Sequence, residues 1–323
     1  MTRPCIVHSG GPPYTTVDNI NMQRWLEFMR SSVVIVNEKA NWGSGRHKVP
    51  QVMAFLDQRG LPCSTRTTEY PGHARELAAA AAAQGIDTVI VIGGDGTVNE
   101  VISGLLTSGH SDMPGIGIIP AGSSNDFSKS LAIPQRWREA CEVVVRGRVR
   151  EVDVGQAGPH YFCSASCLGY FAEVAAGSLA MTKLRGSLRY VIPAFGVIRN
   201  MTGGWEMTVQ ADGRVLHGNY AVLLVGNAPR FGGLTMLPGA RPDDGRLDCL
   251  LIEMAGRWEA LQLIPLVYCK ALERHRKATR FQAASLSVAL TRPTQVCNDG
   301  EMVRNPCESL EYRVLPRRLR ILC

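Results

Sequence analysis

Short runs of β-branched residues alternate with longer stretches of helical periodicity between residues 32 and 147. The clearest example is VIVIGGDGTVNEVISGLL, residues 89–106, where an apolar run passes through three glycines and an aspartate into a helix-like stretch. Repeated strand–helix units of this kind are typical of βαβ structure, which forms a parallel sheet with helices on its faces. We therefore expect an α/β domain, with strands at 32–37, 87–94 and 115–122 and helices at 47–60, 73–85 and 97–106.

After residue 150 the strand-like segments are short and are separated by turn residues. WEMTVQADGRVLHG, residues 205–218, indicates a hairpin, because Asp212-Gly213 adopts the backbone that a two-residue hairpin turn needs. Helical insertions are expected around 170–201 and from 257 to about 277. The second half is therefore predicted to be an antiparallel β-rich domain, with a boundary near 149, and residues 1–30 are predicted to be an N-terminal extension.

Composition is that of an ordinary globular protein, with 45% hydrophobic and 20% charged residues among 323. The apolar runs are too short to span a bilayer, and the N-terminus lacks the apolar core of a secretory signal, so a cytoplasmic protein is expected. The ten cysteines form no CxxC pair and are expected to be reduced.

The formal net charge of +7 suits three kinds of partner: nucleic acid, an anionic membrane surface or an acidic substrate. The basic residues are scattered, apart from RHRK at 274–277 and RRLR at 317–320. Neither run is interleaved with aromatic residues as a surface for single-stranded nucleic acid would be, so no nucleic-acid partner is expected. Each run is either a solvated face or a place of peripheral contact with anionic lipid headgroups.

The turn GGDGT, residues 93–97, lies where a strand ends and a helix begins, which is where ligands bind in open α/β sheets. Its backbone N–H groups can surround an anion such as phosphate. The chain has no GxxxxGK[ST] sequence, and Asn99 stands where a GxGxxG motif has its third glycine. Asp95 has two interpretations: it caps the following helix, or it serves phosphate chemistry through a cation such as Mg²⁺ or by orienting a hydroxyl.

Two further loops are expected at the same edge of the sheet. GIGIIPAGSSNDFSKSL, residues 115–131, ends a strand in a turn that carries Ser123, Ser124, Asn125 and Asp126. VNEKANWGSG, residues 36–45, ends another strand with Asn37 and two glycines. Because the carboxyl ends of parallel strands meet at one edge, the three loops predict a cleft lined by N–H and hydroxyl donors.

Four motifs in this order resemble those of the diacylglycerol kinase catalytic-domain family, the lipid-kinase superfamily that includes sphingosine and ceramide kinases. They are GGDGTVNEV, PAGSSNDFSKSLAIP, GGLTMLPGARPDDGRLD (232–248) and CNDGEMV (297–303), with YRVLPRRLRIL near the end. The soluble bacterial members look most similar, and the resemblance covers roughly residues 32–323. GGDGT alone is weak, since NAD kinases and phosphofructokinases share it.

The resemblance implies an NAD kinase- or phosphofructokinase-like α/β nucleotide-binding domain at 31–149, rejoined by the last strand at 312–323, and a β-rich lipid-substrate domain at 150–311. It implies an ATP site formed by Asn37, Thr68, Gly93, Gly94, Asp95, Gly96, Thr97, Asn99 and Ser123. It also implies a Mg²⁺ ion held by the side chain of Asp244 and the backbone carbonyls of Arg241 and Arg246.

The catalytic residues implied by the family are Asp299 and Glu301, with Glu301 the stronger candidate for the proton acceptor, and Asp95 near a catalytic Mg²⁺. The first loop departs from the family pattern NPxSG, since it is longer and has Glu38 in place of the proline. Ser123 replaces the commoner threonine but keeps the hydroxyl group.

The resemblance implies transfer of the γ-phosphate of ATP to a lipid hydroxyl at a membrane surface. Two alternatives stay open: a kinase of a soluble substrate such as NAD, and a non-catalytic lipid-binding protein on the same fold. The apolar stretch 186–204 is expected either to border an acyl-chain cleft or to pack as a core helix. The bacterial members suggest a homodimer, and the motifs leave the identity of the lipid open.

Overall fold

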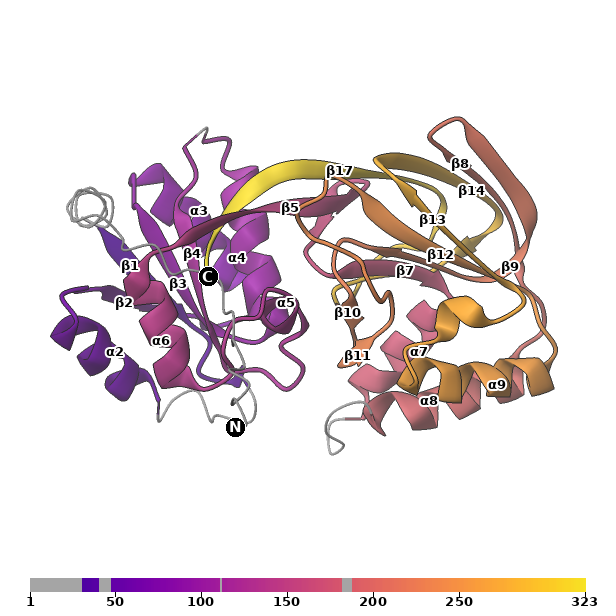
Figure 1. Cartoon of the computed structure of the whole chain (residues 1–323), viewed down its shortest axis with the longest axis horizontal. Coiled ribbons are helices and arrows are strands. Elements are labelled where there is room, and N and C mark those ends of the chain that lie inside the picture. Colours follow the sequence, from indigo (N-terminus) through magenta and orange to yellow (C-terminus); the bar gives the residue numbers. More distant parts are fainter. Residues whose placement is uncertain (1–30, 41–47, 111, 182–187) are drawn as a thin grey trace, which may run out of the picture.

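The structure is a computed structural model that describes residues 31–40, 48–110, 112–181 and 188–323. The extension predicted for 1–30 and residues 41–45 of the first loop lie outside the described residues. A 15-stranded sheet runs through both halves of the molecule, parallel at one end and antiparallel at the other (Figure 1).

The parallel end has the strand order β2 (Ser64–Thr67), β1 (Ser32–Val36), β3 (Thr88–Gly93) and β4 (Gly115–Pro120). Helix α3 (His73–Ala83) packs against α4 (Asp95–Thr107), and α2 (Val49–Gln58) packs against α6 (Trp137–Arg146). These two pairs lie on opposite faces of the sheet, as Figure 1 shows. The predicted α/β architecture is therefore confirmed, with each expected strand and helix close to its expected position.

Strand β2 was not predicted, because its sequence STRT is short and polar. It lies at the edge of the sheet, parallel to β1, and its side chains are mostly exposed. An edge strand of this kind does not need the apolar run that marks a buried parallel strand.

The antiparallel part is built around β7 (Ala165–Gly169), β9 (Arg214–Gly226), β8 (Trp205–Ala211), β14 (Ser285–Thr294) and β17 (Cys307–Leu322), in this spatial order. Strand β12 (Leu247–Glu253) pairs with β9 and with β13 (Ala278–Ala283), and β15 (Val296–Asn298) pairs with β7 and with β16 (Glu301–Met302). The predicted hairpin joins β8 to β9, with positive φ at Asp212 (45°) and Gly213 (80°). The predicted β-rich second half is thus confirmed.

Three helices lie side by side along one face of this sheet: α7 (Tyr170–Leu179), α8 (Leu188–Asn200) and α9 (Arg257–Tyr268) (Figure 1). They fall within the two helical insertions that the sequence predicts; the second insertion ends in the short turn η2 (Leu272–Arg274). No described helix is long and apolar enough to cross a membrane.

Two strands connect the halves. Strand β5 (Val149–Ala157) runs antiparallel to β17, and it also pairs with β6 (His160–Phe162). The end of β17 reaches the parallel sheet, where Ile321 pairs with Ile116 of β4. The buried apolar side chains form two clusters, one in each half, and both strands contribute to both clusters. We keep the division near 149 as a proposal, since β5 itself spans the two clusters.

Candidate active site

A cleft of about 490 Å³ lies at the carboxyl ends of β1, β3 and β4, facing the turn between β15 and β16. The structure brings together here nine of the residues expected in the site: Asn37, Thr68, Gly94, Asp95, Gly96, Thr97, Ser123, Asp299 and Glu301. Gly93 and Asn99 do not line this cleft. Gly93 ends β3 beneath it, and Asn99 lies one turn into α4 with 8% of its surface exposed.

The two glycine turns are pressed against each other at the floor of the cleft. A Cβ atom added to Gly122 would lie 2.5 Å from Cα of Gly94, and one added to Gly93 would lie 2.6 Å from Cβ of Thr97. The Asn37 side-chain amide donates to Thr97 Oγ1 at 3.0 Å, which ties the first loop to the same turn. Side chains are excluded from these positions, so a ligand can approach the backbone closely, although the N–H of Gly122 itself donates to Asn125 Oδ1 (2.9 Å).

Asp95 is the first residue of α4, whose N-cap is Gly94, so the expectation that Asp95 caps this helix is wrong. Its Oδ1 instead accepts a hydrogen bond from the N–H of Phe127 (3.1 Å), in the short helix α5 (Asp126–Ser130). Burial, reinforced by the carboxylates of Asp126 and Asp299, raises the pKa of Asp95 to about 7. This side chain therefore titrates near neutral pH, and a cation beside it would favour its ionised form.

Asp126 connects the two halves of the molecule. Its Oδ2 accepts the N–H of Gly233 (2.7 Å), and its Oδ1 lies 3.4 Å from Nε of Arg230. Both partners belong to the small hairpin of β10 (Arg230–Phe231) and β11 (Leu234–Thr235). Burial raises the pKa of Asp126, while these partners lower it. The sequence placed Asp126 at the rim of the cleft but gave no sign of its partners.

Asp299 is held by four hydrogen bonds. Its Oδ2 accepts from the N–H of Cys163 (2.6 Å) and the amide of Asn99 (2.8 Å), and its Oδ1 accepts from the N–H groups of Ser164 (2.8 Å) and Ala165 (3.0 Å). Burial raises the pKa of Asp299 and these donors oppose the shift. Both oxygens are therefore occupied, and the carboxylate fixes the β15–β16 turn against the start of β7 and against α4.

Glu301 faces the GGDGT turn. A Cβ atom added to Gly96 would lie 2.8 Å from Oε1 of Glu301, so the third glycine of that turn leaves room for this carboxylate. No hydrogen bond within the described part of the chain holds it. Desolvation by the surrounding protein, followed by the charges of Glu100 and Asp299, raises its pKa, and Arg75 opposes the shift. Glu301 is therefore free to accept a proton at the cleft.

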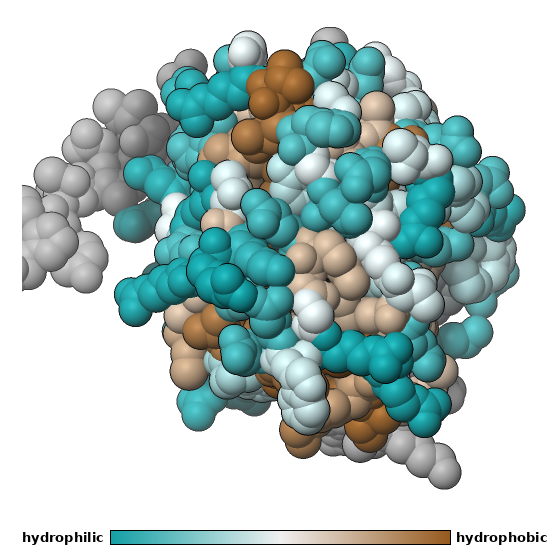
Figure 2. Space-filling view, turned by 90° about the vertical axis from the view of Figure 1, so that its right-hand side faces the viewer, coloured by the Kyte–Doolittle hydropathy of each residue, from teal (hydrophilic) through white to brown (hydrophobic). Residues whose placement is uncertain are grey.

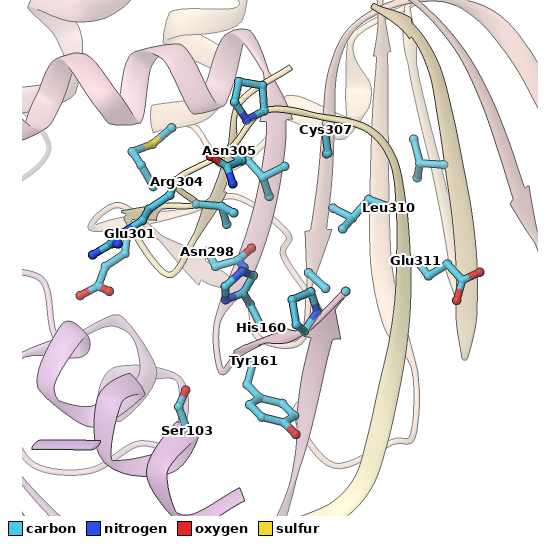
Figure 3. A pocket seen from close by; sticks show the side chains of 18 of the residues that line it. Ser103, His160, Tyr161, Asn298, Glu301, Arg304, Asn305, Cys307, Leu310 and Glu311 are labelled. Atoms are coloured by element: carbon cyan, nitrogen blue, oxygen red, sulfur yellow. The ribbon is translucent and has the colours of Figure 1, made fainter. Parts of the chain in front are cut away.

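A second hollow, of about 1300 Å³, lies on the other side of Glu301, between α4 and the outer face of the antiparallel sheet. Figure 3 shows its lining, with Glu301 at the edge near the helix that carries Ser103, and His160 close to Asn298. Glu301 thus lies between two solvent-filled spaces, only one of which contains the glycine turns.

An apolar cavity of about 140 Å³ lies between α7, α8, α9 and the sheet. Apart from Glu253 its lining is made of apolar and aromatic residues and glycine, among them Val191, Ala194, Leu263 and Val267. Tyr190 lines both this cavity and the polar cleft, and it packs beside Gly232, where an added Cβ would lie 3.1 Å from its ring. The stretch around 186–204 therefore borders a cavity, and of its described residues Pro193 and Met201 are buried.

The predicted metal loop lies outside the cleft. Asp244 Oδ1 accepts the N–H of Arg246 (3.0 Å), and the buried Asp153 accepts the N–H of Gly245 (2.7 Å). Burial raises the pKa of Asp244. Among the described residues no three His, Cys, Asp or Glu side chains are grouped to hold a metal, so an ion here would need the backbone carbonyls of Arg241 and Arg246. The metal site stays a prediction.

Two family models match successive parts of the chain. Residues 31–157 match the model of the diacylglycerol kinase catalytic domain, and residues 164–323 match that of the YegS C-terminal NAD kinase β-sandwich-like domain. The chain belongs to the diacylglycerol kinase catalytic-domain family. A diacylglycerol kinase of Staphylococcus saprophyticus is 29% identical over 270 residues, which cover 83% of this chain and 88% of the relative. A diacylglycerol kinase of Staphylococcus aureus (strain bovine RF122) is 27% identical over 270 residues, which cover 83% of this chain and 85% of the relative.

Solved structures from Bacillus anthracis share the fold. A diacylglycerol kinase from this organism has 22% identity and a TM-score of 0.71, and a second structure has 25% identity and a TM-score of 0.77. Each covers 90% of this chain and 96% of its own. Within the diacylglycerol kinase fold, sequence reasoning missed Arg189, Tyr190 and the Asp126–Arg230 contact. No motif could have indicated them, because they depend on how the two halves meet.

Proposed function

We propose that this lipid kinase transfers the γ-phosphate of ATP, with Mg²⁺, to the hydroxyl group of a lipid. One observation carries the proposal: a free carboxylate, Glu301, lies over Gly96 in a cleft that meets an apolar cavity at Tyr190. Phosphate, proton acceptor and apolar chain would then be placed in sequence across the junction of the two halves.

The glycine turns would bind the phosphates through backbone N–H groups at the N-terminus of α4. Among the described residues, the side chains that line the cleft include five carboxylates and two basic groups, Lys39 and Arg189. A polyphosphate would be repelled by this excess of negative charge unless a divalent cation accompanied it. Asp95, with its pKa near neutral, is the residue we expect to hold Mg²⁺. Mg²⁺ usually binds one or two carboxylates together with substrate phosphates, and when bound it would neutralise charge on the transferred group.

Glu301 would act as the general base. The lipid hydroxyl oxygen attacks the γ-phosphorus, the bond to the β-phosphate oxygen breaks, and the hydroxyl proton passes to the Glu301 carboxylate. Asp299 is less suited to this role because both of its oxygens already accept hydrogen bonds. We therefore assign Asp299 to positioning the turn that carries Glu301.

The apolar cavity favours a lipid over a soluble acceptor such as NAD, since a polar dinucleotide would gain nothing from it. The chains of the lipid would lie among α7, α8 and α9, with the hydroxyl directed past Tyr190 toward Glu301. Such a substrate is presented at a bilayer, so peripheral membrane contact by a cytoplasmic enzyme is part of the proposal. The expected homodimer remains a prediction, which analytical ultracentrifugation would test.

The test is transfer of radiolabelled γ-phosphate from ATP to lipids in mixed micelles with Mg²⁺, with NAD assayed beside them. Glu301→Gln should reduce turnover by about 10² or more, the scale of general-base removal. Glu308→Gln, an exposed residue of β17, is the matched control and should leave turnover unchanged. Label in NAD alone, or equal turnover in both variants, would contradict the proposal. Absence of label from every lipid and from NAD would favour the non-catalytic alternative.

A further inference from the structure

We propose that the outer faces of α8 and α9 form a membrane-docking surface, which places the mouth of the apolar cavity against an anionic bilayer. The inference rests on the proposed lipid-kinase function and names the surface through which the lipid would enter. We call this surface the α8–α9 face; it consists of Leu188, Ile192, Phe195 and Arg199 on α8 with Trp258 and Tyr268 on α9.

Helix α8 is apolar on two sides. One side, with Val191, Ala194 and Ile198, lines the cavity. The other side carries Leu188, Ile192 and Phe195, which follow one another at helical spacing and are 63%, 54% and 52% exposed. A helix that is apolar all round is normally buried. The outer side of α8 is exposed instead, which marks it as a surface for contact with another apolar body.

Helix α9 adds aromatic side chains next to this stripe. Trp258 is 82% exposed and Tyr268 is exposed at the other end of the helix. Helices α8 and α9 contact each other, and both line the apolar cavity. Figure 2 shows apolar side chains gathered at the lower edge of this end of the molecule, where α8 and α9 lie in Figure 1. Tryptophan and tyrosine favour the boundary between water and acyl chains.

The charge of the surrounding residues favours a bilayer over another protein face of ordinary composition. The α8 segment contains no acidic residue; Arg199 lies in its last turn, while Arg189 lines the polar cleft. After α9, Lys270 and Arg274 are exposed, whereas Arg276 and Lys277 pair with Glu259 of α9. Apolar side chains flanked by basic ones are typical of helices that lie in the interface of anionic membranes. A cavity that opens between such helices would receive acyl chains directly from the bilayer.

Trp258 gives a direct readout of docking. Vesicles of phosphatidylglycerol and phosphatidylcholine, without nucleotide, should shift tryptophan emission to the blue, and brominated lipids should quench it. Trp258→Phe should remove most of both signals, because among the described tryptophans Trp205 is buried and Trp137 belongs to the first half. Unchanged emission of the wild-type protein with bound vesicles would overturn the proposal.

The double variant Ile192→Ser/Phe195→Ser should bind these vesicles at least about tenfold more weakly, since two apolar side chains would no longer leave water. Val215→Ser is the matched control, because Val215 is equally exposed (63%) but lies in the β8–β9 hairpin. Equal binding by the double variant and the control would overturn the proposal.

The acceptor separates docking from catalysis. With a water-soluble short-chain diacylglycerol the double variant should keep wild-type kcat/KM, and with a long-chain acceptor in vesicles it should lose about tenfold. An equal loss of kcat/KM with both acceptors would contradict the proposal, because it would show that Ile192 and Phe195 act on substrate binding in the cavity and not on membrane docking. If the double variant binds vesicles more weakly but the wild type phosphorylates no lipid, the docking surface is supported and the proposed kinase activity is refuted. A dimeric wild type and a monomeric double variant with equal vesicle binding would instead assign the face to a second copy.

Discussion

Three carboxylates of the cleft differ in their surroundings and therefore in what they can do. Asp299 has both oxygens occupied by N–H donors, Asp95 accepts one bond from α5, and Glu301 has no hydrogen bond to any residue that the structure describes. A residue that positions a turn and a residue that takes a proton should respond differently to loss of charge. This difference gives two tests at the scale of single side chains.

Asp299→Asn should destabilise the protein by about 2–3 kcal/mol, because an amide cannot accept from all four donors and leaves buried N–H groups unpaired. Its catalytic loss should accompany this loss of stability. Glu301→Gln should reduce turnover without lowering the free energy of unfolding, because no hydrogen bond within the described residues depends on it and its raised pKa means that the fold does not favour the ionised form. Urea titration of both variants checks this, and a stable Asp299→Asn protein would show that the four bonds matter little.

The raised pKa of Asp95 predicts a pH effect on stability in the absence of divalent cations. The folded protein holds a proton on Asp95 up to about pH 7, whereas the unfolded chain releases it near 3.8. The contribution of Asp95 to stability should therefore decline as pH rises from 4 to 7. Asp95→Asn should have a higher Tm than wild type at pH 8, and the difference should vanish near pH 4. A Tm difference between wild type and Asp95→Asn that is the same from pH 4 to pH 8 would contradict the raised pKa of Asp95.

At the scale of elements, the site depends on how closely two turns and one hairpin approach one another. The turn after β3 contacts the turn after β4 at Gly94 and Gly122, and it faces the β15–β16 turn at Gly96. At Gly122 the backbone of Gly94 leaves no space for a Cβ atom, whereas at Gly96 an added Cβ would have to displace the Glu301 carboxylate. The glycines therefore set the distances between elements that come from distant parts of the chain.

Gly96→Ala should displace Glu301 and reduce kcat while the KM for ATP changes little. Gly122→Ala should raise the KM for ATP, because the added methyl would meet the backbone of Gly94 and separate the two phosphate-binding turns. Gly196→Ala on α8 is the control, since nothing lies within 4 Å of its added Cβ. Steady-state kinetics of the three variants will show whether Gly96→Ala acts on kcat and Gly122→Ala on the KM for ATP. The same change of kcat and KM in both variants would refute these separate roles.

Much of this was predictable from sequence, element by element. The β-branched runs of β1, β3 and β4 and the Asp-Gly turn of the hairpin each depend on local properties, and all four were placed correctly. Strand β2 was missed because polar edge residues carry no periodic signal. The role of Asp126 was missed because its partner Gly233 is 107 residues away, and the proposed capping by Asp95 failed because the partner belongs to another helix.

At the scale of the whole molecule, β5 and β17 make the two halves mechanically dependent on each other. Leu319 and Ile321 of β17 are buried in the first cluster, while Tyr312 and Val314 of the same strand are buried in the second. A defect at either end of this strand therefore acts on a structure that both clusters share.

Ile321→Ala should lower the free energy of unfolding by about 2–5 kcal/mol, the usual cost of such a truncation in a core. Because β17 is shared, hydrogen exchange should lose protection in β9 as well as in β3. Ile116→Ala, in the partner strand, should act alike. Loss of protection confined to β3 and its neighbours would show that the halves unfold independently.

The chain leaves the parallel sheet by β5 and comes back by β17, and these two strands are antiparallel neighbours. The second half is therefore an insertion whose entrance and exit lie side by side. Insertion of a segment is tolerated best where its two ends lie close together, and here the β5–β17 ribbon that carries both ends is shared by the two cores. Recombination at this one ribbon would give the same phosphate-handling half a new acceptor, which offers a simple route by which one ancestral kinase could diversify.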